Sequence, residues 1–257
     1  MSSLVERHQF ILQKLKNEGQ VNVVDLCQAL NVSSVTIRKD LKHLEDKELL
    51  YRTHGGGTIS NPYTADRPVN EKAMIRSQEK SGIGQAAAQL IEPNDCILIA
   101  SGTTVHSLAR SIQANGNLTV VTAALNVAME LINHPGIEVI QLPGQIRKTS
   151  SSVTGVYAEK MLTDFSFSKF FLGVDGIDLD FGLTTTNMME AQLNKKMIAA
   201  SQKTIVLADS SKFGKRGFGK ICGLDDVDQI ITDNNISDHT VNTLKGLGIE
   251  VTIVPSN

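Results

Sequence analysis

The sequence predicts a small N-terminal winged helix-turn-helix domain followed by an α/β domain with a mostly parallel sheet. Near the N-terminus, three amphipathic helical segments precede a glycine-rich hairpin. From Asp95 onward, short apolar runs alternate with helical stretches, as in a parallel sheet covered on both faces. With 257 residues, 41% of them hydrophobic, the chain has room for two cores. We expect domains at 1–59 and 72–257, joined by a linker at 60–71.

The first two helices are predicted from apolar spacing and capping residues. Residues 4–17 place apolar side chains on one helical face, and Gly19 follows as a stop signal. Asn22 is a suitable N-cap for the second helix. Only about two residues, Asn31 and Val32, then lead to the third helix, and a helix-turn-helix requires such a tight connection.

The third helix is the candidate recognition helix. Ser33 is a suitable N-cap, and Ile37, Leu41 and Leu44 recur at i, i+4 and i+7 to form one apolar stripe. The opposite face carries cations, hydroxyls and a valine, which suit phosphates, guanine edges and thymine methyl groups. A helix that is merely solvated also has a charged outer face. The candidate DNA-contacting residues of this helix are Ser34, Val35, Thr36, Arg38, Lys39 and Lys42.

The segment after the third helix, LLYRTHGGGTI, predicts a β-hairpin, or wing, around a three-glycine turn. Arg52 and His54 on this wing are candidates for contacts with the DNA backbone or the minor groove. Asp40 lies near the apolar edge of the third helix, so we expect a structural ion pair there, with Arg7 as its partner.

Charge is distributed unevenly along the chain. Residues 1–60 hold eight lysines and arginines against seven aspartates and glutamates, a net charge of +1. The remaining residues hold 17 against 20, a net charge of −3, which agrees with −2 for the whole chain. Because +1 is a weak electrostatic footprint for DNA, the cations clustered on the third helix matter more. We expect affinity to need two copies on a two-fold DNA site, and hence a homo-oligomer, either a dimer or a tetramer.

The cysteines Cys27, Cys96 and Cys222 lie in apolar patterns without metal-ligand spacing. We expect buried free thiols in a reducing cytoplasm. The chain has no apolar run of about 18 residues that would predict a membrane span, and its N-terminus does not resemble a signal peptide. Neither a metal ion nor a cofactor is expected.

Seven apolar runs are predicted to be strands of the parallel sheet: CILIA, LTVVT, IEVIQL, KFFLGVDG, TIVLAD, DQIIT and EVTIV. Helices are expected between most of them, at about 104–112, 125–132 and 188–201, and one helix at about 72–92 opens the domain. In such sheets the carboxyl ends of the strands share one edge, and ligands bind there.

The loops at that edge hold the candidate ligand-binding residues. Gly102 lets backbone approach an anion, the hydroxyls of Thr103 and Thr104 add donors at a helix N-terminus, and Lys212 supplies a point charge. Ordinary structural roles also explain these residues, since glycine and threonine are common in strand-to-helix turns and lysine is common on surfaces. Glu190 likewise suits the positive end of a helix dipole. The full candidate set is Ser101, Gly102, Thr103, Thr104, Asp175, Glu190 and Lys212.

The segment 34–41, SVTIRKDL, together with Arg7, Ile11 and the run 54–56, resembles the DeoR family of bacterial regulators of sugar metabolism. The usual family signature there is Thr-Ile-Arg-Arg-Asp-Leu, whereas this chain has Lys39 at the second basic position. Lysine keeps the charge but loses the bidentate fork of arginine. Whether Lys39 contacts a base or only a phosphate therefore stays open.

The later loops resemble the effector domain of the same family, which is similar in fold to ribose-5-phosphate isomerase and related sugar-phosphate enzymes. The matching pieces are SGTT at 101–104, GVDGID at 173–178, GLTT at 182–185, Glu190-Ala191 and SSKFG at 210–214. The resemblance implies a phosphorylated sugar or similar metabolite held by Thr103, Thr104 and Lys212, with Asp175 near its hydroxyl groups.

Two departures from the family pattern concern the same loops. Ala100 stands where the family often has aspartate, and Ala123-Ala124 stand where it often has asparagine and serine. Because the polar side chains are missing, the identity of the ligand stays open.

Two functions are compatible with the sequence. The first is a transcriptional regulator, expected to be a repressor of a sugar or carbohydrate catabolic operon, which binds operator DNA and responds to a phosphorylated sugar. The alternative is a sugar-phosphate isomerase that carries a DNA-binding module. Isomerisation needs a base, and Asp175 and Glu190 are the candidates in the matched loops. We predict the regulator and no enzymatic activity, because a polar binding site would contain such carboxylates anyway.

Overall fold

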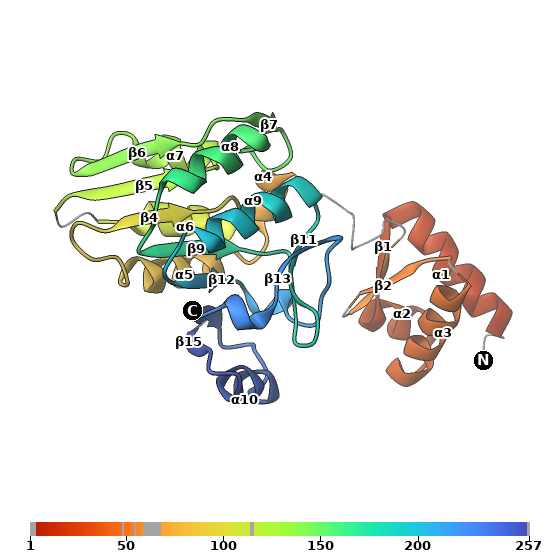
Figure 1. Ribbon diagram of the computed structural model, residues 1–257. Helices are drawn as coiled ribbons and strands as arrows, with labels where there is room; N and C mark the ends of the chain where they lie inside the picture. The colour runs from red at the N-terminus through yellow and green to blue at the C-terminus, as the bar shows by residue number, and fades with distance from the viewer. Residues whose placement is uncertain (1–3, 48, 54, 59–67, 114–115, 256–257) are drawn as a thin grey trace. The chain divides into compact units, whose positions relative to one another are not determined.

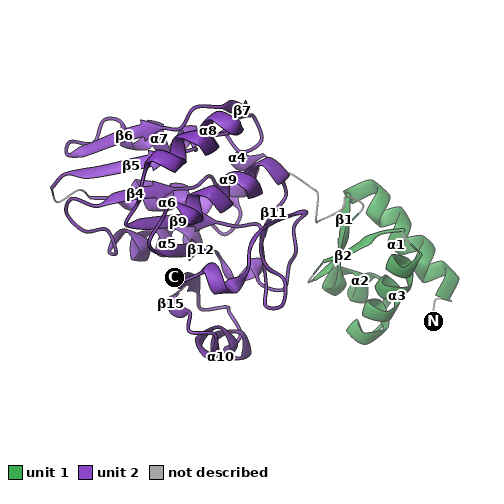
Figure 2. Cartoon of the chain, viewed as in Figure 1, with its two compact units in different colours: residues 1–65 green, residues 66–257 purple. Residues whose placement is uncertain are grey.

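The computed structural model describes residues 4–47, 49–53, 55–58, 68–113 and 116–255. The chain divides into two compact units, residues 1–65 (unit 1) and residues 66–257 (unit 2), shown in different colours in Figure 2. Residues 60–67 of the predicted linker lie outside the described residues, and residues 69–71 belong to a helix of unit 2.

Unit 1 is the winged helix-turn-helix that the sequence predicts (Figure 1). Ile11 and Leu15 of the first helix pack with Leu26 of the second and with Ile37 and Leu41 of the third. The three short strands form an antiparallel sheet in the order β1-β3-β2. The elements are α1 (Leu4–Glu18), β1 (Gln20–Asn22), α2 (Val23–Leu30), α3 (Ser34–Asp46), β2 (Tyr51–Thr53) and β3 (Gly56–Thr58).

Both predicted N-caps of unit 1 are present. The Asn22 side chain accepts from the second backbone N–H of α2 at 2.8 Å, and Ser33 Oγ accepts from the N–H of Thr36 at 3.3 Å. Helix α2 ends at Asn31 with φ of 50°, a left-handed conformation that asparagine tolerates. The connection to α3 is three residues long rather than two because Ser33 stays outside the helix as its cap.

The predicted ion pair of Asp40 is confirmed. Arg7 donates from Nε and Nη2 to the two carboxylate oxygens at 2.8 and 3.0 Å, and His8 Nε2 lies 3.1 Å from Oδ1. Burial alone would raise the pKa of Asp40, but the hydrogen bonds from Arg7 and His8 hold that pKa below its usual value. Asp40 therefore ties α3 to α1.

Unit 2 is built on a seven-stranded sheet in the order β15-β14-β12-β9-β4-β5-β6 (Figure 1). Every neighbouring pair is parallel, and the seven strands are the seven that the apolar runs predict. They are β4 (Cys96–Ile99), β5 (Leu118–Thr122), β6 (Ile137–Gln141), β9 (Lys169–Gly173), β12 (Thr204–Leu207), β14 (Gln229–Asp233) and β15 (Glu250–Val254).

Helices cover both faces of this sheet. One core cluster contains side chains of α5, α6 and α7, and the other contains side chains of α8, α9 and α10. Gly84 lets α5 and α6 pack closely, because a Cβ there would lie 2.5 Å from the backbone of Ser107. The helices are α4 (Val69–Met74), α5 (Ser77–Ala88), α6 (Thr103–Ser111), α7 (Leu125–Leu131), α8 (Val156–Met161), α9 (Met188–Ala199) and α10 (Asp238–Gly246).

The structure differs from the sequence prediction at the start of unit 2. The single helix expected at 72–92 is two helices, α4 and α5, and the break falls at Ile75 and Arg76, where Arg76 has φ of 53°. A β-hairpin and a small antiparallel sheet in the order β10-β11-β13 were also not predicted. These strands are β7 (Gln145–Arg147), β8 (Ser152–Thr154), β10 (Gly176–Asp178), β11 (Gly182–Thr185) and β13 (Gly219–Cys222).

The three cysteines are free thiols, but only Cys222 is buried, whereas Cys27 and Cys96 are half-buried. The prediction that all three are buried was therefore wrong for two of them, which lie at the margins of their cores. None of the helices in the described part of the chain is long and apolar enough to cross a membrane.

Candidate functional site

The outer face of α3 presents most of the predicted DNA-contacting residues to solvent. Val35 is 59% exposed. Thr36 is half-buried, and its hydroxyl lies 3.0 Å from that of Ser33 at the helix N-terminus. The side chains that are exposed together on this face are Ser34, Val35, Arg38, Lys39 and Lys42.

The wing places Arg52 on β2, beside the end of α3. Its backbone N–H donates to Glu45 Oε1 at 2.9 Å, and its guanidinium Nη1 lies 3.6 Å from Glu45 Oε2. Both side chains are more than a third exposed, so a phosphate could compete with Glu45 for the guanidinium. His54 lies outside the described residues, and its predicted role stays a prediction.

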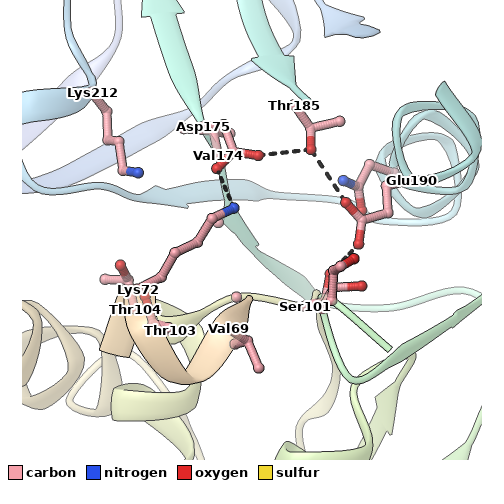
Figure 3. A pocket seen from close by; sticks show the side chains of 15 residues that line it. Val69, Lys72, Ser101, Thr103, Thr104, Val174, Asp175, Thr185, Glu190 and Lys212 are labelled. Carbon is pink, nitrogen blue, oxygen red and sulfur yellow. Dashed lines mark hydrogen bonds and ion pairs between the residues drawn. The ribbon is translucent and has the colours of Figure 1, made fainter. Parts of the chain in front are cut away.

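The predicted ligand-binding loops of unit 2 meet in one pocket (Figure 3). All seven predicted residues line it, although they come from four separate segments of the chain. The segments with Ser101, Asp175 and Lys212 follow β4, β9 and β12, parallel strands that end at the same edge of the sheet, whereas Glu190 lies on α9, which follows β11 of the small antiparallel sheet. The sequence prediction named these lining residues: Ser101, Gly102, Thr103, Thr104, Asp175, Glu190 and Lys212.

One wall of the pocket is the N-terminus of α6. Its N-cap residue is Gly102, with φ of 135°, which has no side chain to accept from the first turn of the helix. Thr103 and Thr104 follow as the first two residues of α6. The free backbone N–H groups and the positive end of the helix dipole make this wall suited to an anion.

Asp175 lies in the middle of the pocket lining and is held by several donors. Lys72 Nζ, reaching from α4, lies 3.0 Å from Asp175 Oδ1, and Thr185 Oγ1 donates to Oδ2 at 3.0 Å (Figure 3). Burial alone would raise the pKa of Asp175, but the charges of Lys72 and Lys212 hold it below its usual value. Asp175 is therefore a carboxylate, an acceptor for hydroxyl groups.

Glu190, near the start of α9, is the second carboxylate of the pocket. Arg147 Nη1 lies 2.6 Å from Oε1, in a pair whose side chains are only 14% and 11% exposed. The same Oε1 accepts from Ser101 Oγ at 3.4 Å and from Ser152 Oγ at 3.3 Å, while Thr185 Oγ1 lies 3.3 Å from Oε2. Glu190 thus links four segments of unit 2.

Lys212 ends the short 3-10 helix η2 (Ser210–Lys212), which follows β12. Asp209 caps that turn by accepting from the N–H of Ser211 at 3.0 Å, and Arg76 lies 3.8 Å from the same carboxylate oxygen. Within the described residues, no carboxylate pairs with Lys212, so its charge is available to a ligand.

Several pocket residues were missed by the sequence prediction. Lys72 had been assigned to the start of a long helix, and nothing in its local pattern shows that the chain folds it back onto Asp175. Thr149 and Ser150 belong to the hydroxyl-rich run KTSSS, a signal that could have been noticed. The missed lining residues are Val69, Lys72, Thr149, Ser150, Gly173, Val174, Thr185 and Asn194.

The two departures from the family pattern do not border the pocket. Ala100, Ala123 and Ala124 are at most 3% exposed and belong to the hydrophobic cores. In the described ranges, no group of three or more histidine, cysteine, aspartate or glutamate side chains is placed to hold a metal ion.

A winged helix-turn-helix with a cationic outer face, in one chain with a parallel α/β unit that carries a charged pocket, defines a class of protein, the ligand-responsive transcriptional regulator. Comparison with known proteins identifies the family within that class. A model described as the DeoR-like helix-turn-helix domain matches residues 7–62, and a model described as the DeoR C terminal sensor domain matches residues 75–234.

Similar proteins cover almost the whole chain. The putative aga operon transcriptional repressor of Escherichia coli O157:H7 is 36% identical over 97% of this chain and 93% of its own length. The HTH-type transcriptional repressor GlcR of Bacillus subtilis is 30% identical over 96% of this chain and 95% of its own length. The glycerol-3-phosphate regulon repressor of Escherichia coli K12 is 28% identical over 89% and 90%, respectively.

Among solved structures, ribose 5 phosphate isomerase A from Neisseria gonorrhoeae matches 53% of this chain and 53% of its own, with 16% identity and a TM-score of 0.40. A likeness this distant carries no argument about function. The family models and the relatives decide the matter: the chain belongs to the DeoR family and is a DNA-binding transcriptional regulator.

Proposed function

We propose that the protein represses a sugar or carbohydrate catabolic operon in the cytoplasm and that a phosphorylated sugar or related metabolite in the pocket of unit 2 controls its hold on DNA. The observation that carries this proposal is the pocket, where a helix N-terminus and two lysines face two carboxylates and several hydroxyls. The names of the relatives support it, since one is a repressor of the glycerol-3-phosphate regulon.

The charges of the pocket suit a ligand with an anionic end and a hydroxylated end. A phosphate at the N-terminus of α6 would accept from the backbone of Thr103 and Thr104 and would lie among the lysines Lys72 and Lys212. The carboxylates of Asp175 and Glu190 are acceptors for the hydroxyl groups of a sugar. We assign the ligand-binding role to the seven predicted residues and add Lys72 to them.

The same carboxylates argue against the isomerase alternative. A general base works best with a pKa near the working pH, whereas the pKa of Asp175 is held below that of an ordinary aspartate. Oε1 of Glu190 lies 2.6 Å from Arg147 Nη1 in an ion pair, which occupies one of the two carboxylate oxygens. Both groups are arranged to hold a ligand rather than to move its protons.

For DNA binding, we propose that α3 enters the major groove. Arg38 contacts a base edge or anchors the helix beside it, and Lys42 contacts a phosphate. Lys39 is assigned to either partner, and Arg52 to the backbone beside the wing. The net charge of unit 1 is low, so two copies of it are needed for adequate affinity for operator DNA. We therefore propose a homo-oligomer. The complete proposed set is Ser34, Val35, Thr36, Arg38, Lys39, Lys42, Arg52 and His54.

The test compares wild type with Lys212→Ala. Operator duplexes are selected from random sequences by binding, and binding is then titrated with a panel of sugar phosphates and their unphosphorylated analogues. Because Lys212 would make a charge-assisted contact to the phosphate, the variant should need about 10- to 100-fold more of the phosphorylated effector. Its operator affinity without effector should equal that of wild type, because Lys212 belongs to unit 2 and the DNA-contacting helix α3 belongs to unit 1.

The exposed Lys196→Ala on α9 serves as the matched control and should behave as wild type. If Lys212→Ala responds at the wild-type effector concentration, Lys212 takes no part in binding. If it loses operator binding without any effector, the lysine is structural, and the proposed separation of DNA reading from ligand sensing is wrong.

A further inference from the structure

The hairpin β7–β8 forms a wall of the pocket that nothing in the proposed function uses. Its turn contains the run KTSSS, residues 148–152, and Thr149 and Ser150 of that run line the pocket. Both residues are half-buried. A hydroxyl can donate and accept, which suits a wall that recognises the hydroxyl groups of a sugar.

The turn lies at the Glu190 end of the pocket. Ser150 Oγ lies 2.8 Å from Ser152 Oγ, and Ser152 Oγ donates to Glu190 Oε1 at 3.3 Å. Figure 3 shows Glu190 and Lys212 on opposite sides of the pocket, with Asp175 between them. A ligand whose phosphate lies at Lys212 would therefore point its other end toward Glu190 and the turn.

Arg147 fixes the turn to Glu190. Its Nη1 lies 2.6 Å from Glu190 Oε1, and its Nη2 donates to Thr149 Oγ1 at 3.2 Å, so one guanidinium orients a pocket carboxylate and a pocket hydroxyl together. The contact to Glu190 is an ion pair and the contact to Thr149 is a hydrogen bond, and both come from the one planar guanidinium that lysine lacks. Arg147 is not among the residues that line the pocket, so it acts through its neighbours as a positioning residue.

We propose that the turn of β7–β8 determines which sugar phosphate is accepted, with Thr149 and Ser150 reading the end of the ligand remote from the phosphate and Arg147 holding them in register with Glu190. This inference rests on the proposed function and deepens it, because it assigns the choice of ligand to a different part of the pocket from phosphate binding.

The turn is also bonded to α4, the first helix of unit 2. The backbone N–H of Val69, at the start of α4, donates to the carbonyl oxygen of Thr149 at 2.7 Å. A ligand that fits the turn therefore meets two segments that hold α4, namely Thr149 through this bond and Asp175 through its pair with Lys72. The turn that would recognise the ligand is thus in direct contact with α4.

The experiment measures affinities of the full chain by titration calorimetry for inorganic phosphate and for pairs of epimeric hexose and pentose phosphates. The variants are Thr149→Val, Ser150→Ala and Arg147→Lys, with the exposed Thr163→Val as the control for loss of a hydroxyl. We expect the affinity for inorganic phosphate to stay within about twofold of wild type. The ratio of affinities between the preferred sugar phosphate and its epimer should fall by about three- to tenfold, as for loss of one neutral hydrogen bond.

Arg147→Lys should lower the same ratio without weakening phosphate binding, which a merely structural role would not do. The inference is overturned if wild type discriminates between epimers and all three variants keep the wild-type ratio within twofold. It is equally overturned if the variants lose affinity for phosphate and for both epimers in the same proportion. If wild type binds neither phosphate nor any sugar phosphate, the proposed function itself fails, and this inference fails with it.

Discussion

At the scale of single residues, helix α3 buries one charged side chain and exposes its lysine and arginine side chains to solvent. Asp40 is 3% exposed, and its carboxylate oxygens contact Arg7 and His8. The cations Arg38 and Lys42 of the same helix are exposed to solvent. A buried carboxylate is tolerated because its hydrogen bonds replace the lost hydration. The internal pair therefore fixes the orientation of α3 and leaves its cationic face free for DNA.

This separation leads to a prediction for Arg38. Replacing Arg38 by alanine should cost about 1–3 kcal/mol at one base pair of the operator, seen as a relaxed preference at that position, because a bidentate contact to a guanine edge is lost. Lys42→Ala should instead weaken binding to all sequences alike and flatten its salt dependence, as expected for a phosphate contact.

Operator variants titrated at several salt concentrations measure both effects. The exposed Lys16→Ala on α1 is the control for loss of one positive charge from unit 1. A well-folded Arg38→Ala with wild-type affinity and an unaltered base preference would remove Arg38 from the interface.

At the scale of elements, the short helix α4 is stabilised by a lysine from the next helix. Lys80 of α5 is 5% exposed, and its ammonium donates to the carbonyl oxygens of Lys72 and Ile75, the latter at 2.7 Å. These contacts satisfy the C-terminal end of α4. They lie beside Ile75 and Arg76, where the chain breaks between α4 and α5 and the single helix expected at 72–92 is interrupted.

The buried ammonium predicts a pH dependence of stability. Burial lowers the pKa of Lys80 to about 8, below the value of about 10.4 for an unfolded lysine. Between these two values the folded state releases a proton that the unfolded state retains, so the free energy of unfolding rises with pH through that window. The rise amounts to roughly 3 kcal/mol if the whole difference is realised.

Denaturant unfolding at pH 7.5 and pH 10 of wild type and Lys80→Met measures this effect, because the difference between the two proteins cancels the other titrating groups. As pH rises, the free energy of unfolding of the wild type should increase relative to that of Lys80→Met. The exposed Lys196→Met should show the same change with pH as the wild type. A difference between wild type and Lys80→Met that does not change with pH would show that Lys80 is not buried as a charged group.

At the scale of the whole molecule, the two units have separate cores. Among the described residues, the buried cluster of unit 1 runs from Ile11 to Leu50, whereas the buried clusters of unit 2 begin at Ile83 and at Leu98. Because the described residues that line the pocket all belong to unit 2, a ligand that binds there stabilises that unit directly.

Calorimetry should accordingly show two unfolding transitions. A bound sugar phosphate at about 100 times its Kd should stabilise unit 2 by about 2.7 kcal/mol and raise only the transition of that unit. Operator DNA should raise only the other. A ligand that moves both transitions equally would contradict this separation and indicate that the two units unfold as one.

The sequence by itself determined the winged helix-turn-helix of unit 1 and the parallel sheet of unit 2. Apolar spacing and caps such as Ser33 specify unit 1, and seven apolar runs specify the parallel sheet, because helix and strand periodicity are local properties of the chain. The rule that strands of a parallel sheet end at one edge was enough to bring Ser101, Asp175 and Lys212 into one candidate site.

Only the tertiary structure decided how the pocket is completed. Lys72 reaches Asp175 across 103 positions, and Arg147 pairs with Glu190 from a hairpin that no periodicity predicted. Such contacts depend on where the backbone turns, here at Arg76 and in the β7–β8 turn. A local sequence pattern does not show which distant residues will lie beside it. Long-range ion pairs can therefore be identified only from the folded structure.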